Sequence, residues 1–207
     1  MVPAGAAQLD VAEELGRPEM SLDLKERQKS ATIDTERLSL RALRQGDAEA
    51  IAAALSDFAV TGMLARPPYP FTADDAEDWL DALQDSKDRE WSFAITQPED
   101  RVLIGVVTIE LRQGGYHLGY WLSRYYWGRG FMSEAASALL ARFFAEKGAV
   151  TLNSGAFAEN GASLKVQQRL GFQVTGLRDI YAASRGAMVQ EVTTALTPDY
   201  FRPYHFG

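Results

Sequence analysis

The sequence predicts an α/β (α+β) fold in which a mixed, mostly antiparallel central sheet of about seven strands is flanked by about four helices. Between residues 91 and 122 three strand patterns follow one another with turn residues between them, which is typical of an antiparallel meander. A long helical pattern then separates the third strand from the next one. A strand, helix, strand succession of this length implies a right-handed crossover with parallel pairing.

Residues 1–33 differ from the rest of the chain and predict an N-terminal extension, either flexible or packed as an arm on the domain or on a second subunit. Asp10–Leu15 and Leu22–Lys29 are weakly helical pieces within it. The remainder, residues 34–207, contains no repeat or linker and is expected to form one domain.

The first part of the domain is expected to contain a strand and two short helices. Leu38 and Leu40 alternate with charged neighbours, as in a half-buried strand. Asp47 is expected to cap a helix that begins at Ala48, and Thr72 starts the next helix.

The second part supplies the meander, the crossover and a closing hairpin. The expected strands cover residues 91–95, 103–111, 116–122, 151–157, 174–181 and 189–196. The crossover helix follows Gly130 and ends at Gly148, because its apolar residues have the spacing of one buried helical face: Ala135, Ala136, Leu139, Leu140, Phe143 and Phe144. A further helix begins at Asn160 and ends at Gly171.

The composition limits the functions that the chain can have. A hydrophobic content of 46% over 207 residues allows one sizeable core, and the absence of cysteine excludes disulfides, thiolate metal sites and a cysteine nucleophile. A formal charge of −7 argues against a general nucleic-acid or anionic-membrane partner, which would need a basic face. Two distant histidines predict no metal site. Without a membrane-span or signal-peptide pattern, we expect a cytoplasmic protein.

The stretch from Ser123 to Ala136 carries the clearest functional signal. It is expected to form the end of a strand, a loop with Gly128 and Gly130, and the first turn of a helix. Such a loop presents unpaired backbone N–H groups at the positive end of a helix dipole, which suits a phosphate or pyrophosphate. Its flanks fit neither the Gly-x-Gly-x-x-Gly dinucleotide fingerprint nor the Gly-Lys-Ser/Thr of a P-loop.

Four motifs lie in this half of the chain: residues 118–122 (Leu-Gly-Tyr-Trp-Leu), residues 127–135 (Trp-Gly-Arg-Gly-Phe-Met-Ser-Glu-Ala), Asn160-x-x-Ser163, and residues 170–172 (Leu-Gly-Phe). Together they resemble the GNAT superfamily of N-acetyltransferases, and above all its RimJ/RimL-like branch, which acetylates ribosomal-protein N-termini. The resemblance covers roughly residues 35–200. One departure is Tyr125, where many members carry Gln or Arg.

This resemblance implies acetyl-CoA as the cofactor, with its pyrophosphate held chiefly by the backbone of the loop. The loop residues implied are Trp127, Gly128, Arg129, Gly130, Phe131, Met132 and Ser133, and the Arg129 side chain is expected to contact phosphate. The resemblance also implies that the strand at 116–122 splays from its neighbour. Backbone N–H groups near Trp121 and Leu122 would then meet the acetyl carbonyl and the pantetheine arm.

Two residues are candidates for the general base. RimJ/RimL-like sequences often have Glu two residues before the glycine of Gly-Tyr-Trp, where this chain has His117, and an imidazole can accept a proton at neutral pH. Glu110, near the end of the preceding strand, is the second candidate. The structural alternatives are a hydrogen-bonded or solvated histidine and a solvent-facing carboxylate.

The Asn160-x-x-Ser163 motif implies that Ser163 hydrogen-bonds or protonates the coenzyme sulfur and that Asn160 meets the pantetheine amides. Asn at an N-cap is also ordinary helix-start chemistry, and both roles can hold together. Residues 66–71 contain three prolines, which forbid regular structure, and this loop is the expected wall of the acceptor site. Tyr69 and Phe71 are its candidate substrate contacts, with packing alone as the alternative.

The sequence therefore predicts an acetyl-CoA-dependent N-acetyltransferase in which a primary amine attacks directly in a ternary complex. A protein or peptide N-terminal α-amine is the first acceptor expected. Two alternatives stay open: a small-molecule amine such as a polyamine, amino sugar or amino-acid derivative, and a non-catalytic acyl-CoA-binding sensor. A homodimer through the sheet edge or the C-terminal hairpin is compatible with the sequence.

Overall fold

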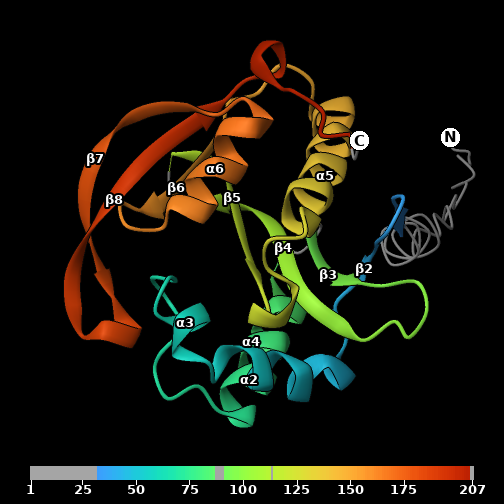
Figure 1. The fold of residues 1–207 in the computed structure, drawn as a ribbon, viewed down its shortest axis with the longest axis vertical. Coiled ribbons are helices and arrows are strands. Elements are labelled where there is room, and N and C mark those ends of the chain that lie inside the picture. Colours follow the sequence, from blue (N-terminus) through green and yellow to red (C-terminus); the bar gives the residue numbers. More distant parts are fainter. Residues whose placement is uncertain (1–31, 87–90, 113, 206–207) are drawn as a thin grey trace, which may run out of the picture. The chain divides into compact units, whose positions relative to one another are not determined.

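A computed structural model describes residues 32–86, 91–112 and 114–205 of the chain (Figure 1). The strands among these residues form one eight-stranded sheet in the order β1-β2-β3-β4-β5-β6-β8-β7. They are β1 (Ile33–Asp34), β2 (Ser39–Ala42), β3 (Ser92–Thr96), β4 (Leu103–Arg112), β5 (Gly115–Leu122), β6 (Leu152–Phe157), β7 (Gln173–Ala182) and β8 (Ala187–Leu196). Neighbours pair antiparallel except β5 and β6, which are parallel, so the predicted mixed sheet is confirmed.

Five α-helices in the described part of the chain flank this sheet: α2 (Ala48–Leu55), α3 (Phe58–Thr61), α4 (Ala73–Asp85), α5 (Phe131–Lys147) and α6 (Gly161–Leu170). Every predicted strand and helix of the domain is present. The additional elements are β1, with 2 residues, and α3, with 4 residues. Elements this short contain too few residues for a periodic pattern, so the sequence could not predict them.

The predicted N-terminal extension, with its two helical pieces, lies outside the described residues as far as residue 31. Its last residue, Ile33, belongs to β1 and pairs with Leu40 of β2. Within the described ranges, no helix is long and apolar enough to cross a membrane.

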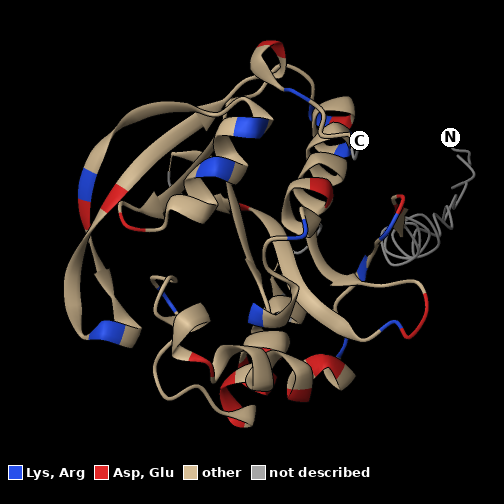
Figure 2. Ribbon diagram, viewed as in Figure 1, with Lys and Arg blue, Asp and Glu red and all other residues tan. Residues whose placement is uncertain are grey.

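One face of the sheet is covered by α2 and α4. Ile51 and Leu55 of α2 and Leu80 of α4 are buried against Val106 of β4. Thr72 caps α4 as predicted, since its hydroxyl accepts a hydrogen bond from the Asp75 N–H at 3.2 Å. Acidic residues gather along α4 (Figure 2), as expected for an amphipathic helix with one buried face.

The opposite face of the sheet is covered by α5 and α6, whose buried residues include Leu139 and Phe143 of α5 and Leu170 of α6. All six residues of the predicted α5 stripe are at most 9% exposed. The helix ends as predicted at Gly148, which has a φ of 71° and donates to the Phe144 carbonyl at 2.9 Å.

Asp47 does not cap α2 with its side chain, so that prediction is wrong. Its two carboxylate oxygens instead accept hydrogen bonds from the Arg41 guanidinium at 2.7 and 2.8 Å and from the Arg44 N–H at 3.0 Å. A bidentate pair with arginine is a stronger interaction for a buried carboxylate than a single N–H bond at a helix start. Asp47 therefore ties the end of β2 to the turn before α2.

The parallel pairing of β5 with β6 ends soon after it starts. It joins Tyr116 to Leu152 and His117 to Asn153, while the later residues of the two described strands are not paired with each other. The predicted splay is thus present. We call the stretch beyond these two pairs, where the backbones of the two strands are no longer paired, the opening between β5 and β6.

The end of α6 generates a stability prediction. Gly171 follows the helix with a φ of 97°, and an added Cβ would overlap the carbonyl oxygen of Tyr200. We expect Gly171→Ala to lower the free energy of unfolding by about 3 kcal/mol. Two costs contribute: the strain of a positive φ at alanine and the clash of its Cβ with the Tyr200 backbone. The control Gly186→Ala has a φ of 60° with no atom within 4 Å of the new Cβ, so only the backbone cost of about 1 kcal/mol remains. Equal losses in urea unfolding would contradict the clash.

Candidate active site

The loop between β5 and α5 presents backbone donors without helical partners. Gly128 and Gly130 have φ values of 75° and 77°, and α5 begins directly after Gly130. The first helical hydrogen bond is donated by the Glu134 N–H to the Gly130 carbonyl at 3.1 Å, so the N–H groups of residues 131–133 precede it. Three such amides at the start of a 17-residue helix have a geometry suited to an anion.

The side chains around these amides divide into buried and exposed groups. Phe131 and Met132 are buried in the core, so only their backbone faces the loop. Ser133 is 1% exposed and its Oγ has no hydrogen-bond partner within the described residues. Arg129 is exposed, with its guanidinium 5.7 Å from the centre of the Tyr126 ring. An orphaned buried hydroxyl beside free amides fits an anionic ligand such as a pyrophosphate.

Arg37, at the start of the domain, holds the loop in place. Its guanidinium donates to Glu134 at 2.6 and 2.8 Å and to the Arg129 carbonyl at 3.0 Å. Burial raises the pKa of the Glu134 carboxyl, but hydrogen bonds from Thr35 and Arg37 outweigh burial and hold that pKa below its usual value. Glu134 is thus a carboxylate in the first turn of α5 that is bound to Arg37, and sequence reasoning did not select Arg37. Its partners lie about ninety residues away in sequence, which no local pattern reveals.

Backbone groups of β5 line the opening toward β6. The N–H of Ser123, the residue after β5, donates to the Ile104 carbonyl of β4 at 2.8 Å. Because hydrogen-bonded residues alternate along an antiparallel pair, the Trp121 N–H is also directed to β4. The N–H groups of Tyr120 and Leu122 are directed to the opening. The expectation that the Trp121 amide is freed is therefore wrong, while that for Leu122 agrees with the register. The Trp127 indole also bonds the Leu122 carbonyl from this side, at 2.7 Å.

Ser163 lies beside a hydroxyl that sequence reasoning did not select. The Tyr120 hydroxyl is 2.8 Å from Ser163 Oγ and 3.2 Å from the Ser163 carbonyl oxygen. Gln167 donates weakly to the same Oγ at 3.4 Å, and Asn160 caps α6 by accepting from the Ser163 N–H at 3.0 Å. Burial raises the pKa of Tyr120 despite hydrogen bonds from Ser163 and Gln167, so the phenol keeps its proton at neutral pH. Alternation along β5 already placed Tyr120 on this face; its partner on α6 could not be inferred.

The predicted bases occupy the other face of the sheet, where His117 is the direct cross-strand partner of Glu110. Burial raises the pKa of Glu110, but Arg66 and Arg112 together outweigh it and hold the pKa below its usual value. Arg66 donates to both Glu110 oxygens at 2.9 and 2.8 Å, and Arg112 donates at 3.0 Å. Glu110 is therefore an ionised carboxylate whose oxygens are hydrogen-bonded to two arginines.

His117 is half-buried and, unlike Glu110, is held in its neutral form. Burial, followed by the positive charges of Arg112 and Arg178, lowers the pKa of its imidazole, against the smaller effects of Glu110 and Glu191. The imidazole is consequently neutral at pH 7 and able to accept a proton. The structure brings His117 and Glu110 together but makes only His117 available as a base.

The face of the sheet that carries His117 is bordered by the loop after α3 and by the end of the β7–β8 hairpin (Figure 1). Ser184 in the hairpin turn donates to the Thr61 carbonyl at 3.1 Å, and Arg185 donates to the Gly62 carbonyl at 2.6 Å. Of the predicted wall residues, Tyr69 is 47% exposed, with its ring centre 5.0 Å from that of Phe58. Phe71 is 8% exposed and packs in the α2–α4 core, which contradicts its expected contact with substrate.

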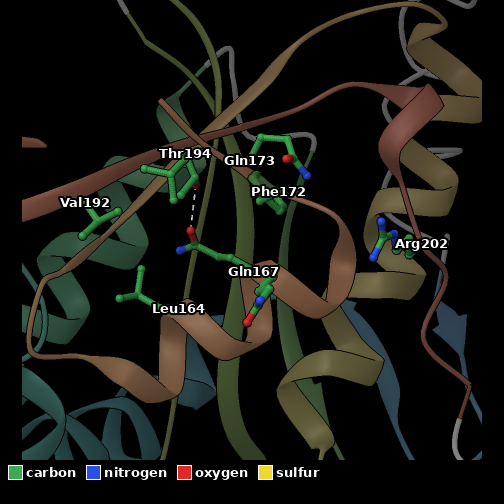
Figure 3. A pocket seen from close by; sticks show the side chains of 9 residues that line it. Leu164, Gln167, Phe172, Gln173, Val192, Thr194 and Arg202 are labelled. Atoms are coloured by element: carbon green, nitrogen blue, oxygen red, sulfur yellow. Dashed lines mark hydrogen bonds between the residues drawn. The ribbon is translucent and has the colours of Figure 1, made fainter. Parts of the chain in front are cut away.

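A cavity of about 730 Å³ lies between α6 and the β7–β8 hairpin (Figure 3). Its lining contains none of the predicted cofactor residues and consists of Leu164, Gln167, Gln168, Phe172, Gln173, Val174, Val192, Thr194 and Arg202. The Gln167 side chain stands between this cavity and Ser163, because its Oε1 accepts from the Thr194 hydroxyl at 2.7 Å while its Nε2 faces Ser163. The cavity is thus distinct from the opening between β5 and β6.

The fold and the loop are those of a known class of acyltransferases. Residues 37–173 match the acetyltransferase (GNAT) domain. This match covers more than half of the chain, and the chain therefore belongs to the GNAT family of N-acetyltransferases. The predicted family and enzyme class are confirmed.

Relatives and solved structures agree with this assignment. An uncharacterized N-acetyltransferase, p20, of Bacillus licheniformis is 29% identical over 163 residues, which are 76% of this chain and 91% of that protein. The ribosomal-protein-S5-alanine acetyltransferase of Vibrio fischeri shares the fold with a TM-score of 0.69 at 21% identity, covering 84% of this chain and 100% of that one. The microcin C7 self-immunity acetyltransferase MccE was solved with acetyl-CoA and AMP. It has a TM-score of 0.66 at 16% identity, and the match covers 79% of this chain and 93% of that one.

The environment of His117 predicts an imidazole pKa below the ordinary value of about 6.5. Arg112→Gln should raise this pKa, because it removes a nearby positive charge, and Glu110→Gln should lower it further, because it removes a negative one. Titration of the His117 ring protons by NMR, with His117→Gln to assign the signal, measures all three values. A wild-type pKa at or above 6.5, or shifts of the same sign in both variants, would contradict the electrostatic description.

Proposed function

We propose that the protein transfers the acetyl group of acetyl-CoA to the α-amine of a protein or peptide N-terminus, with the amine attacking directly in a ternary complex. The observation that carries the proposal is the position of a glycine loop and helix start next to an opening in the sheet, with a hydroxyl pair on one side and a neutral imidazole on the other. Binding, attack and proton transfer can then take place at one point of the sheet.

The residues present fit acetyl-CoA. The amides of residues 131–133 and the Arg129 side chain would hold its pyrophosphate, and the opening between β5 and β6 would admit the pantetheine arm. The Leu122 N–H is directed to the opening and would stabilise negative charge on the acetyl oxygen. The cofactor, when bound, supplies an acetyl group on a thioester. A bound acetyl-CoA in MccE supports this assignment.

The chain's own groups account for the protons. As the amine nitrogen forms its bond to the acetyl carbon and the carbon–sulfur bond breaks, His117 takes the proton that the nitrogen loses, directly or through water. Ser163 Oγ gives a proton to the departing sulfur. Because Tyr120 keeps its own proton and contacts Ser163, it can replace the one that Ser163 donates. Glu110 is the weaker candidate for the base, since two arginines occupy it.

An imidazole base takes a proton more readily from an acceptor of low basicity than from a strongly basic one. An α-ammonium group has a pKa of about 8 and a lysine or polyamine ammonium one of about 10.4. Proton transfer to His117 from a lysine or polyamine ammonium is less favourable than from an α-ammonium by about 2.5 pKa units, or about 3.5 kcal/mol. The S5-alanine acetyltransferase among the structural neighbours acts on a ribosomal protein, which is consistent with this choice. An α-amino acid derivative has the same amine chemistry and is the second candidate.

A thiol-release assay with acetyl-CoA tests the proposal. We expect turnover with short peptides that have free N-termini, and a kcat/KM at neutral pH at least about tenfold higher than for a polyamine or a lysine side chain in an N-blocked peptide. Release with polyamines or amino sugars alone would overturn the acceptor assignment. Coenzyme A binding without release by any amine would favour the sensor.

Variants of the hydroxyl pair test the proton donor. We expect Ser163→Ala to lower kcat about 100-fold while the KM for acetyl-CoA stays within about threefold, because the donor acts when the carbon–sulfur bond breaks. Tyr120→Phe should have a smaller effect, about tenfold, since Ser163 remains. Ser39→Ala, on the remote strand β2, serves as the matched control. A Ser163→Ala enzyme with unchanged kcat would leave the Ser163 hydroxyl only its structural contacts with Tyr120 and Gln167.

A further inference from the structure

Glu191 is a nearly buried carboxylate on the acceptor face of the sheet, and neither the proton transfers nor the cofactor site uses it. Its residue is 9% exposed. Arg178, its cross-strand partner on β7, donates from Nε to Glu191 Oε2 at 2.5 Å. The other oxygen, Oε1, accepts no hydrogen bond from any residue in the described ranges. This second carboxylate oxygen is free to accept a hydrogen bond from a ligand.

Gly155 makes room for this carboxylate. A Cβ at Gly155 would lie 2.6 Å from both the Cδ and the Oε1 atoms of Glu191, so the carboxylate lies directly over the β6 backbone at that residue. Gly155 has no positive φ that would require glycine. The absence of a side chain here serves the close approach of the carboxylate to the strand.

This oxygen lies on the same face of the sheet as His117 and next to the opening. His117 pairs with Asn153, so these two residues share a face of the sheet. Gly155 lies two residues after Asn153 on β6, and every second residue of a strand is on the same face. Gly155 is also the second residue after the last pair between β5 and β6. The charges of Glu191 and Arg178 both act on the His117 imidazole, which places the two groups in one electrostatic environment.

We propose that Glu191 Oε1 binds the acceptor amine and orients it over the opening between β5 and β6. The carboxylate accepts an N–H hydrogen bond from the amine, which leaves the nitrogen lone pair free to attack. It also stabilises the positive charge that develops on nitrogen as the N–C bond forms. The proton is then lost to His117, so Glu191 is neither consumed nor protonated. This role rests on the acetyl transfer proposed above and defines its acceptor as a group that carries N–H donors and develops a positive charge.

The first test compares Glu191→Gln with the wild type, using a tetrapeptide with an N-terminal alanine as the acceptor. We expect kcat/KM for the peptide to fall by about 10- to 100-fold, because a charged hydrogen-bond acceptor is lost. The Kd for coenzyme A from calorimetry and the slow hydrolysis of acetyl-CoA without amine should both stay within about twofold, since neither uses the carboxylate. Glu159→Gln is the matched control, because Glu159 also pairs with an arginine, Arg185, but is 55% exposed.

The second test moves the carboxylate without removing its charge. Gly155→Ala places a methyl group 2.6 Å from Glu191 Oε1, which forces the carboxylate to move. It should therefore lower kcat/KM for the peptide by a similar factor and leave coenzyme A binding intact. Glu191→Gln also leaves Arg178 without its ionic partner. Adding Arg178→Gln to Glu191→Gln should not restore activity, because the missing group is the carboxylate.

The outcomes separate this inference from the proposed function. A wild-type enzyme that releases no thiol with any amine would overturn the acetyl transfer itself. An active wild type with unchanged kcat/KM in Glu191→Gln and Gly155→Ala would overturn the role of Glu191 alone, as would recovery in the double variant. A fall in melting temperature with unchanged kcat/KM would assign Glu191 to holding the hairpin, and would likewise contradict the proposal.

Discussion

The site depends on the early end of the pairing between β5 and β6. Two residue pairs join these strands, at Tyr116–Leu152 and His117–Asn153, and after them the strands separate. The separation leaves backbone donors of β5 directed to a gap instead of to a neighbouring strand. It also lets both faces of the sheet reach one point, with the start of α5 and Ser163 on one face and His117 on the other.

Two charged pairs stabilise the surroundings of this gap. Arg37 binds Glu134 and the Arg129 carbonyl, which connects the start of the domain to the glycine loop. Arg178 binds Glu191 on the hairpin that borders the acceptor side. In each pair the carboxylate is the more buried partner, so breaking the pair leaves that buried charge uncompensated even where the pair itself adds little net stability. Their role here is therefore to define the geometry of the loop and of the acceptor side, while the two apolar cores provide most of the stability.

Much of this arrangement could be predicted from the sequence, because it depends on local patterns. The stripe of α5, the capping residues Thr72 and Asn160, and the glycines that end α5 and α6 are all short-range signals. The glycine loop identified the family for the same reason. Asp47 was misassigned because its partner Arg41 lies on a strand rather than in the following helix.

The missed site residues depend on contacts between distant segments. Tyr120 meets Ser163 across 43 residues, and Arg37 meets Glu134 across 97. Glu191 lies over Gly155 only because β8 pairs with β6, which the sequence order of the strands does not specify. Phe71 could not be assigned to the wall or the core, since a proline-rich loop has no periodicity that tells its two sides apart.

The most direct test of the central claim is to follow backbone amide signals by NMR while coenzyme A is added. A cofactor held by the helix start and the opening in the sheet should shift the amides of Phe131, Met132, Ser133 and Leu122 most strongly, with the Trp121 amide affected less because it is directed to β4. An absence of shifts, or shifts confined to the cavity between α6 and the β7–β8 hairpin, would contradict the account.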